Sequence, residues 1–222
     1  MQELVVRKNS VTKKENEIEK DDKNYKELLN IYSIALTKVK EKLIEIQKEA
    51  NLYSGYDVIS NVSSRIKSYN SIIKKMQKKG YNLTYESLIK NINDIAGVRV
   101  TCMSEKDIYK IVKVISNLEN INIIKEKDYI KKHKKSGYSA YHMIVEVPIY
   151  IEEKQVWVKV EIQIRTIGMD FWSIIEHKVK YKSDTKLSRK NSNKLKFYAS
   201  IISKINNNMA KMYKNNYKYI EN

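Results

Sequence analysis

The side chains with the clearest potential for chemistry lie at residues 160–166, where an acid, an amide and a guanidinium alternate with aliphatic residues. Successive side chains of a β-strand point to opposite faces, so Glu161, Gln163 and Arg165 share one face and the isoleucines between them share the other. The pattern predicts a strand whose aliphatic side lies in the core. An ordinary strand with a solvated polar face would show the same alternation, and a structural salt bridge would explain Arg165 as well.

A second carboxylate, Asp94, opens residues 94–100, a predicted buried strand. Two carboxylates from different strands can hold a hard cation through oxygen ligands. Magnesium held by Asp94 and Glu161 would bridge nucleotide phosphates and offset the charge that develops in phosphoryl transfer. In the same strand, Gly97 permits close backbone approach and Arg99 offers a flat cation for stacking on a base. A turn residue without chemistry is the simpler interpretation of Asp94.

Cations gather at the end of the predicted strand 56–67 and along the predicted helix 68–79. If the N-terminus of this helix points at the site, its backbone N–H groups and Ser71 can hold phosphate oxygens beside Arg65 and Lys67. A solvated basic helix face would explain the helix lysines equally well: Lys74, Lys75, Lys78 and Lys79.

A lysine-rich loop follows the predicted strand 121–129 and ends in Gly137 and Tyr138, with His142 shortly beyond. An exposed aromatic ring amid lysines suits a nucleobase that stacks on the ring while the lysines bind its phosphates, and such stacking is typically worth ~1–3 kcal/mol. A charged loop with a tyrosine packed beneath it is the alternative.

The composition is that of a basic globular protein. The 222 residues include 42% apolar side chains, enough for a core, and carry a formal charge of +17, which points to polyanionic partners such as nucleotides, RNA or an acidic membrane surface. The single cysteine, Cys102, excludes a disulfide framework and a Cys-based zinc site. Without a membrane-length apolar run or a signal-peptide pattern, we expect a cytoplasmic protein with no membrane association.

Hydrophobic periodicity predicts the elements that position these side chains. Ser104 followed by Asp107 predicts a capping box, Gly80 predicts a left-handed helix C-cap, and Pro148, the only proline, favours the edge or end of a strand. The order of elements indicates an α+β domain with a mixed β-sheet. Besides a helix that opens at Ser104, the predicted helices are 22–50, 68–79, 85–91, 168–181 and 186–217, and the predicted strands are 56–67, 94–100, 121–129, 141–150 and 155–165.

Two of the predicted helices carry apolar stripes. On 168–181, where we expect structural roles for Trp172 and His177, the predicted apolar side consists of Phe171, Ile174, Ile175 and Val179. The stripe of the last helix could pack on this domain, on the N-terminal helix or on another subunit, with self-association favoured. Its members are Leu195, Tyr198, Ile202, Ile205, Met209 and Met212.

In order and spacing, these clusters resemble the synthetase domain of the RelA/SpoT family, specifically the small alarmone synthetases. The resemblance covers residues 56–182 and implies a nucleotidyltransferase-like α+β fold, a mixed β-sheet with flanking helices and helical N- and C-terminal extensions. The matching stretches are Arg65-x-Lys67-x-x-x-Ser71-x-x-x-Lys75, Asp94-Ile95-Ala96-Gly97-Val98-Arg99, Lys127-Asp128-Tyr129-Ile130, Ser136-Gly137-Tyr138-x-x-Tyr141-His142 and Glu161-Ile162-Gln163-Ile164-Arg165-Thr166, continued by Phe171-Trp172 and Glu176-His177-Lys178.

The resemblance implies Mg²⁺-dependent transfer of pyrophosphate from ATP to the 3′-hydroxyl of GDP or GTP, which makes the stringent-response alarmones ppGpp and pppGpp and releases AMP. Asp94 and Glu161 would hold Mg²⁺, with Glu161 also placed to take the proton of the attacking hydroxyl. Arg65 and Arg99 would sandwich adenine. The residues expected on the ATP phosphates are Lys67, Ser71 and Lys75, and those expected on the guanine nucleotide are Lys127, Lys134, Tyr138, His142 and Gln163.

Two departures from the family's pattern bear on activity. Ser139 and Ala140 stand where the family usually has arginine and then serine, so a cation is missing beside the predicted acceptor site, and the choice among GMP, GDP, GTP and tRNA stays open. None of the three histidines is followed by aspartate, as in the family's hydrolase metal motif, which predicts synthesis without hydrolysis. The alternatives are a toxin-like relative that pyrophosphorylates the 3′ end of tRNA and a non-catalytic RNA-binding relative.

The expected organisation has four parts: a mobile polar lead-in at 1–21, an N-terminal helical extension at 22–55, the synthetase domain at 56–182 and a C-terminal helix at 183–222 that could serve oligomerisation. The expected partners are ATP, a guanine nucleotide and further copies of the chain, with a tetramer as one candidate. RNA is a further candidate partner.

Overall fold

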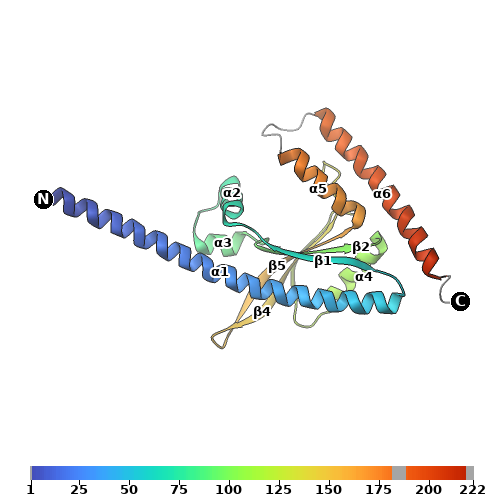
Figure 1. The fold of residues 1–222 in the computed structure, drawn as a ribbon, viewed down its shortest axis with the longest axis horizontal. Coiled ribbons are helices and arrows are strands. Elements are labelled where there is room, and N and C mark those ends of the chain that lie inside the picture. The colour runs from blue at the N-terminus through green and yellow to red at the C-terminus, as the bar shows by residue number, and fades with distance from the viewer. Residues whose placement is uncertain (1, 182–188, 219–222) are drawn as a thin grey trace.

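The protein is built around one five-stranded mixed β-sheet (Figure 1). The structure is a computed structural model that describes the backbone of residues 2–181 and 189–218 and the side chains of residues 25–179 and 191–216. In the strand order β1-β2-β5-β4-β3, β2 and β5 run parallel and the other neighbouring pairs run antiparallel, which confirms the predicted fold class. The strands are β1 Ile59–Ile66, β2 Ala96–Cys102, β3 Asn122–Asp128, β4 Tyr141–Ile151 and β5 Lys154–Thr166.

The helices in the described ranges are α1 Gln2–Ser54, α2 Tyr69–Lys79, α3 Tyr85–Asn91, α4 Glu105–Ser116, α5 Ile167–Tyr181 and α6 Arg189–Lys218. Most lie within a few residues of their predicted bounds. The exception is α1, which begins at Gln2 rather than near residue 22. Periodicity reveals only helices with an apolar face, whereas the first turns of α1 are rich in lysine and glutamate, which are strong helix formers without such a face.

Three local signals in the sequence are confirmed. Ser104 and Asp107 form a capping box at the start of α4, and Gly80 ends α2 in the left-handed conformation with φ 69°. Pro148 lies in β4 beyond the stretch that pairs with β3, so one edge of the strand is open there. The Pro148 carbonyl accepts a hydrogen bond from Lys38 Nζ of α1 (2.7 Å), while β5 remains paired with the other edge of β4.

Helices α1 and α4 contribute to one core with the aliphatic face of β5. Figure 1 shows α1 running along the sheet, and its predicted apolar residues are no more than 7% exposed. The alternation of β5 is also confirmed, because Val160, Ile162 and Ile164 are fully buried. The polar side chains of β5 therefore project from the opposite face of the sheet, away from this core. The buried residues of α1 are Leu28, Tyr32, Leu36, Val39, Leu43 and Ile46.

The predicted apolar side of α5 is wrong. Its four members are 39–56% exposed, and the helix instead buries Met169, Trp172 and Glu176. Apolar residues occur around most of this helix, so spacing alone could not select the face. The face is selected by Trp172, which packs against Tyr138 and donates from Nε1 to the Leu195 carbonyl (3.1 Å). The exposed residues are Phe171, Ile174, Ile175 and Val179.

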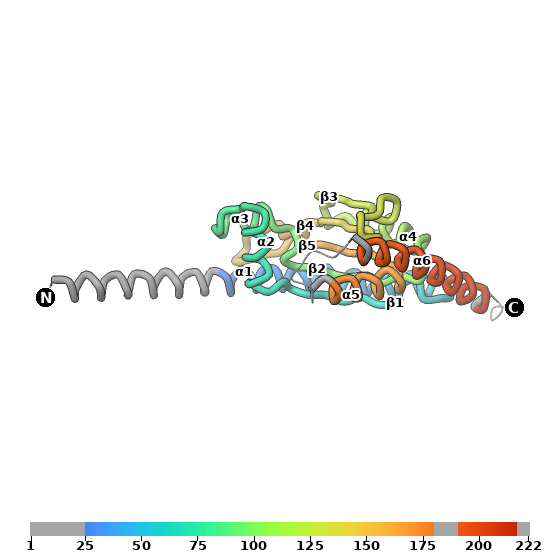
Figure 2. Tube along the Cα trace, turned by 90° about the horizontal axis from the view of Figure 1, so that it is seen from above, coloured from blue at the N-terminus to red at the C-terminus, as the bar shows by residue number. Residues whose placement is uncertain are grey.

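Helix α6 lies beside α5 and contacts the rest of the domain at several points along its length (Figures 1 and 2). Asn206 accepts from the Gly168 amide (2.9 Å) and donates to the Met103 carbonyl (3.2 Å). Lys214 Nζ reaches the fully buried carboxylate of Asp107 (2.8 and 2.9 Å). The expected boundary between domain and C-terminal helix falls at residues 182–188, outside the described part of the chain. Within the described ranges, none of the helices combines the length and apolar character that a bilayer crossing requires.

Candidate active site

Strand register gathers the predicted site residues on one face of the sheet. Arg99 of β2 lies opposite Gln163 of β5, which lies opposite His142 of β4, which in turn lies opposite Lys127 of β3. Directly paired residues point to the same side of a sheet, so these four side chains form a row across four strands. The next row contains Glu161, paired on one side with Gly97, which is paired in turn with Arg65.

Two cavities meet on this face. A cavity of about 190 Å³ is lined by Arg65, Gly97 and Arg99, and a cavity of about 700 Å³ is lined by all five residues expected on the guanine nucleotide. Asp94 and Glu161 line both cavities, and so does Gln163. The two candidate metal ligands therefore lie where the cavities join. The predicted residues that line the larger cavity are Lys75, Lys127, Lys134, Tyr138 and His142.

Asp94 is held by two lysines that lie on the segment after β1. Lys67 Nζ is 2.7 Å from Oδ2 and Lys75 Nζ is 2.8 Å from Oδ1. Burial raises the pKa of Asp94, but the hydrogen bonds and charges of the two lysines outweigh it, and the net pKa lies below its ordinary value. Asp94 is therefore ionised at neutral pH, and both its oxygens are already oriented towards cations.

Glu161 is held by its neighbours on the same face. Its Oε1 lies 3.1 Å from His142 Nδ1, and its Oε2 accepts a hydrogen bond from Gln163 Nε2 (2.7 Å). Burial raises the pKa of Glu161, but the contacts with His142 and Gln163 outweigh it and leave the net pKa below the ordinary value of 4.5. A second buried carboxylate thus stays ionised beside the first.

The ring of Tyr138 is buried, which corrects the expectation of an exposed aromatic platform. The residue is 8% exposed, with Lys134 Nζ 4.4 Å and the Arg165 guanidinium carbon 5.2 Å from the ring centroid. Lys134 lies in an exposed loop, and its side chain is long and flexible, so its ammonium can move away from the Tyr138 ring. Tyr129, which belongs to a matching stretch but was given no role from the sequence, also lines this cavity, and Lys134 Nζ lies 4.5 Å from its ring centroid.

Of the residues expected on the ATP phosphates, Lys67 and Lys75 contact Asp94 as described. Ser71 lies in the exposed first turn of α2, and its Oγ is 2.8 Å from Ser68 Oγ. This turn contains no acidic residue, and the N-cap residue Ser68 makes no capping hydrogen bond from its side chain. The positive end of the helix dipole is therefore uncompensated, which favours an anion there.

Arg165 forms the salt bridge that we held as the alternative interpretation. Its guanidinium is 4% exposed, with Nη1 3.2 Å from Asp170 Oδ1 and Nη2 donating to the Tyr138 hydroxyl (2.7 Å) and to Gln163 Oε1 (2.6 Å). Asp170 also pairs with Arg99 Nη1 (3.1 Å). Sequence reasoning missed Asp170, and the available signal was an acid in the first turn of the helix that directly follows β5.

Comparison with known proteins identifies the family. Residues 64–186 match a family model described as the region found in RelA / SpoT proteins. The chain belongs to the RelA/SpoT family. It is 40% identical over 178 residues to GTP pyrophosphokinase YwaC of Bacillus subtilis (strain 168), which covers 80% of this chain and 85% of that protein.

Solved structures of RelA/SpoT relatives have the same fold. The small alarmone synthetase 1 from Bacillus subtilis, bound to its product pppGpp, has a TM-score of 0.75 and 31% identity, covering 82% of this chain and 92% of that one. The same synthetase bound to AMPCPP has a TM-score of 0.70 and 27% identity, covering 86% of this chain and 97% of that one. The predicted recognition as a small alarmone synthetase is therefore confirmed.

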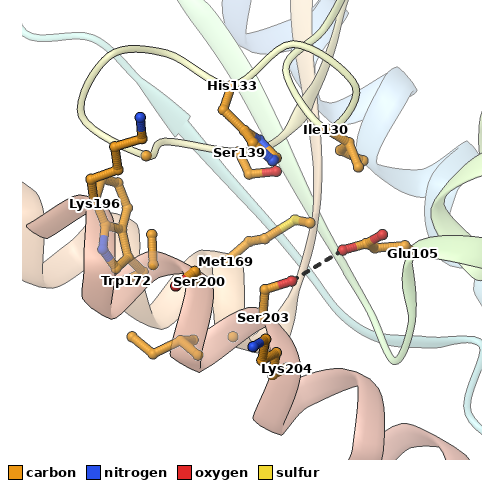
Figure 3. Close-up of a pocket in the computed structure, with 14 residues that line it drawn as sticks. Glu105, Ile130, His133, Ser139, Met169, Trp172, Lys196, Ser200, Ser203 and Lys204 are labelled. Atoms are coloured by element: carbon orange, nitrogen blue, oxygen red, sulfur yellow. Dashed lines mark hydrogen bonds between the residues drawn. The ribbon is translucent and has the colours of Figure 1, made fainter.

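The departure at Ser139 from the RelA/SpoT pattern lies elsewhere than expected. Ser139 lines a third cavity of about 360 Å³, between the loop that carries His133 and helices α5 and α6, rather than the larger cavity beside Glu161 (Figure 3). Its Oγ is buried without a hydrogen-bond partner. Trp172 separates this cavity from Tyr138 and is structural, as expected. His177 lines the larger cavity, and its expected structural role stays a prediction.

Proposed function

We propose that this protein transfers the pyrophosphate of ATP to the 3′-hydroxyl of GDP or GTP, forming ppGpp or pppGpp and AMP. One observation carries the proposal: two cavities share a pair of ionised carboxylates, Asp94 and Glu161. A transferase of this kind needs a donor site and an acceptor site that meet at the reacting phosphorus. The relatives named as GTP pyrophosphokinase and as a pppGpp-bound synthetase support the same assignment.

The smaller cavity is the adenine end of the donor site, and its phosphate end lies beside Asp94, where Lys75 also lines the larger cavity. Arg65 and Arg99 offer two planar cations for an adenine ring. Lys67 and Lys75, with Ser71 at the N-terminus of α2, are the groups for the ATP phosphates. The AMPCPP-bound relative supports an ATP-like donor, since AMPCPP is a methylene analogue of ATP.

The larger cavity is the acceptor site. Lys127, Lys134 and His142 supply charge and hydrogen bonds for a guanine nucleotide, and Gln163 supplies an amide. Stacking on Tyr138 requires that Lys134 leave the ring and move to the nucleotide phosphates, to which its ammonium is equally suited. With Lys127 and Lys134 in this cavity, the acceptor site keeps cations despite the serine at position 139.

The two carboxylates fit a divalent cation of the Mg²⁺ type, because they are hard oxygen ligands that remain charged at neutral pH. Among the described side chains, no group of three or more His, Cys, Asp or Glu residues is arranged to hold a metal. Substrate phosphates and water would therefore complete the coordination. Bound Mg²⁺ would supply charge stabilisation for the transferred group.

The chain's own groups perform the remaining steps. The acceptor 3′-oxygen attacks the β-phosphorus of ATP, the bond from that phosphorus to the α,β-bridging oxygen breaks, and AMP leaves with the electron pair. Glu161 takes the proton of the attacking hydroxyl. Because its pKa is low, it is a weak base, so substrate positioning, together with charge stabilisation by Lys67 and Lys75, contributes most of the acceleration.

Self-association is a second part of the proposal. The stripe of α6 is only partly used by the domain, since Tyr198, Ile205, Met209 and Met212 are 50–67% exposed. The neighbouring helix α5 also exposes apolar residues, and a second copy of the chain is the occupant we propose, with a tetramer as one candidate. Sedimentation of the purified protein tests it: a monomer at all concentrations would contradict this part.

The test of the activity is a product assay. Purified protein is incubated with Mg²⁺ and ATP labelled on the β-phosphate, together with GMP, GDP, GTP or tRNA, and the products are separated by chromatography. We expect label in ppGpp or pppGpp, and none without Mg²⁺. The charge of +17 favours one second candidate, a tRNA 3′-end pyrophosphokinase. Label found only in tRNA would refute the proposal and support that candidate.

A further inference from the structure

Five side chains of the acceptor side form a closed hydrogen-bonded ring. Arg165 donates to the Tyr138 hydroxyl, that hydroxyl lies 2.7 Å from His142 Nε2, and His142 Nδ1 lies 3.1 Å from Glu161. Gln163 closes the ring, since it donates to Glu161 and accepts from Arg165. The links to His142 are satisfied when its Nδ1–H donates to Glu161 and the Tyr138 hydroxyl donates to its Nε2, which is an assignment of protons from the hydrogen-bond network. Glu161 is thereby tied to the residues of the acceptor cavity.

Asp170 connects this ring to the donor cavity. The same oxygen, Oδ1, lies 3.2 Å from Arg165 Nη1 and 3.1 Å from Arg99 Nη1. Arg99 lines the smaller cavity, and Tyr138 and His142 line the larger one. Arg165 and Asp170 line neither of these cavities. Their place in the molecule is between the two sites.

The contact at Asp170 is shared between two guanidinium groups. The Nε atoms of Arg99 and of Arg165 are both buried without a hydrogen-bond partner, so neither guanidinium is fully satisfied and both use that oxygen as a charged partner. A nucleobase that stacks on the Arg99 guanidinium would draw it away from Asp170. Asp170 then pairs with Arg165 alone. Arg165 is held more firmly, and with it the Tyr138 hydroxyl and Gln163.

We propose that Arg165 and Asp170 are positioning residues that couple the two sites, so that an adenine nucleotide at Arg99 strengthens binding of a guanine nucleotide beside Tyr138 and His142. This inference rests on the proposed function, because it takes the two cavities as donor and acceptor sites. Coupling is reciprocal, so the guanine nucleotide strengthens binding of the adenine nucleotide by the same factor, which is typically about 5- to 150-fold.

The test is calorimetric titration of GDP into the full-length protein, with and without saturating AMPCPP, which binds without being cleaved. For the wild type we expect the Kd of GDP to fall at least about fivefold when AMPCPP is present. In Asp170→Asn, which keeps the shape but not the charge, we expect this ratio to approach one. Asp170→Glu restores the charge and is expected to recover part of the ratio. A purely structural role for Asp170 would lower stability without changing the ratio.

Matched controls keep the result interpretable. Asp57→Asn makes the same change at a carboxylate that accepts from the Tyr213 hydroxyl and lines neither cavity, so the ratio should match the wild type. If Asp170→Asn fails to give a cooperative unfolding transition, Arg165→Lys is the second variant. The contacts of Arg165 come from two nitrogens, Nη1 to Asp170 and Nη2 to Tyr138 and Gln163, and a single ammonium nitrogen does not reproduce this geometry. A wild-type ratio of one, or an unchanged ratio in the folded variant, would overturn the coupling.

The outcomes also separate the two proposals. A wild type that makes pppGpp but shows no coupling refutes only the inference, since the product assay does not depend on Asp170. A wild type that binds both nucleotides with coupling but transfers nothing refutes the proposed function while the link between the sites stands. Absence of binding by either nucleotide refutes both.

Discussion

Glu161→Gln is the sharpest single test of the site. The substitution keeps the shape of the side chain but removes its charge and its ability to take a proton. It also turns one acceptor into a donor, because Glu161 receives hydrogen bonds at both oxygens, from His142 and from Gln163. In the variant, the new amide N–H₂ must face one of these two donors.

The structure gives separate magnitudes for stability and activity. One buried donor left without a partner costs ~1–3 kcal/mol, which for a chain of this size corresponds to a fall in Tm of roughly 2–12 °C. Losing the proton acceptor and one metal ligand together removes about 10⁴-fold from the transfer rate, equivalent to ~5 kcal/mol of transition-state stabilisation. Activity should therefore fall far more than stability.

The assay measures ppGpp formation from ATP and GDP beside thermal unfolding of the same preparations. Glu126→Gln is the matched control: Glu126 accepts a hydrogen bond from the Tyr141 hydroxyl (3.0 Å) at the edge of the sheet and lines neither nucleotide cavity. It should transfer like the wild type. If Glu161→Gln is folded and keeps more than about a tenth of wild-type transfer, Glu161 is neither the proton acceptor nor a required metal ligand.

Three further predictions concern pH, acceptor binding and the packing of α6. The pKa values of Asp94 and Glu161 lie below their ordinary values of 3.8 and 4.5, so their contribution to folding stability is full above about pH 5 and is lost only as pH falls through the lowered values. A pH profile of the transfer rate should therefore show no carboxylate step between about pH 5 and 7. Such a step would contradict the assignment of both groups as ionised carboxylates. Tyr138→Phe keeps the ring but removes the hydroxyl between Arg165 and His142, so the KM for GDP should rise about 2- to 10-fold with little change in the KM for ATP. Equal changes in the two KM values would argue against a role of Tyr138 in the acceptor site. Gly137→Ala should lower the free energy of unfolding by ~2–4 kcal/mol in denaturant titrations, since φ is 89° and a Cβ would lie 2.8 Å from the Ala199 Cβ of α6. The control is Gly80→Ala, at φ 69° with open space, which should lower it by only ~1–2 kcal/mol. Equal losses would mean that α6 does not pack against the loop at Gly137.

Local chemistry explains what could be predicted from the sequence. The alternation of β5 and the capping box at Ser104 depend on residues close together in the chain, so both patterns can be recognised in the sequence. The gathering of Asp94, Glu161 and the acceptor lysines was predictable because polar residues on one face of neighbouring strands must meet once the strands pair.

What could not be predicted depends on tertiary packing. In the sequence, Asp170 is an ordinary acidic residue in the first turn of a helix. Only the folded β5–α5 junction places it between Arg99 and Arg165. The burial of Tyr138 results from Trp172 and the adjacent α6, whose docking the sequence left open among three partners. The face of α5 was mispredicted for the same reason: burial of Trp172 against Leu195 outweighs several aliphatic residues on the other side.

The ion pairs at Asp94 have a consequence for how a charged donor can enter so basic a site. Lys67 and Lys75 are proposed for the ATP phosphates, yet in the structure both rest on Asp94. Donor binding would then be an exchange of partners: the lysines would turn from the carboxylate to the ATP phosphates, and Asp94 would be available to hold the divalent cation. Every charge has a partner before and after the exchange, so neither a bare carboxylate nor a bare ammonium is left buried, which would be costly at either stage. The same reasoning makes Asp94 a requirement for the empty site as well as for the occupied one, because without it two lysines would face each other unpaired.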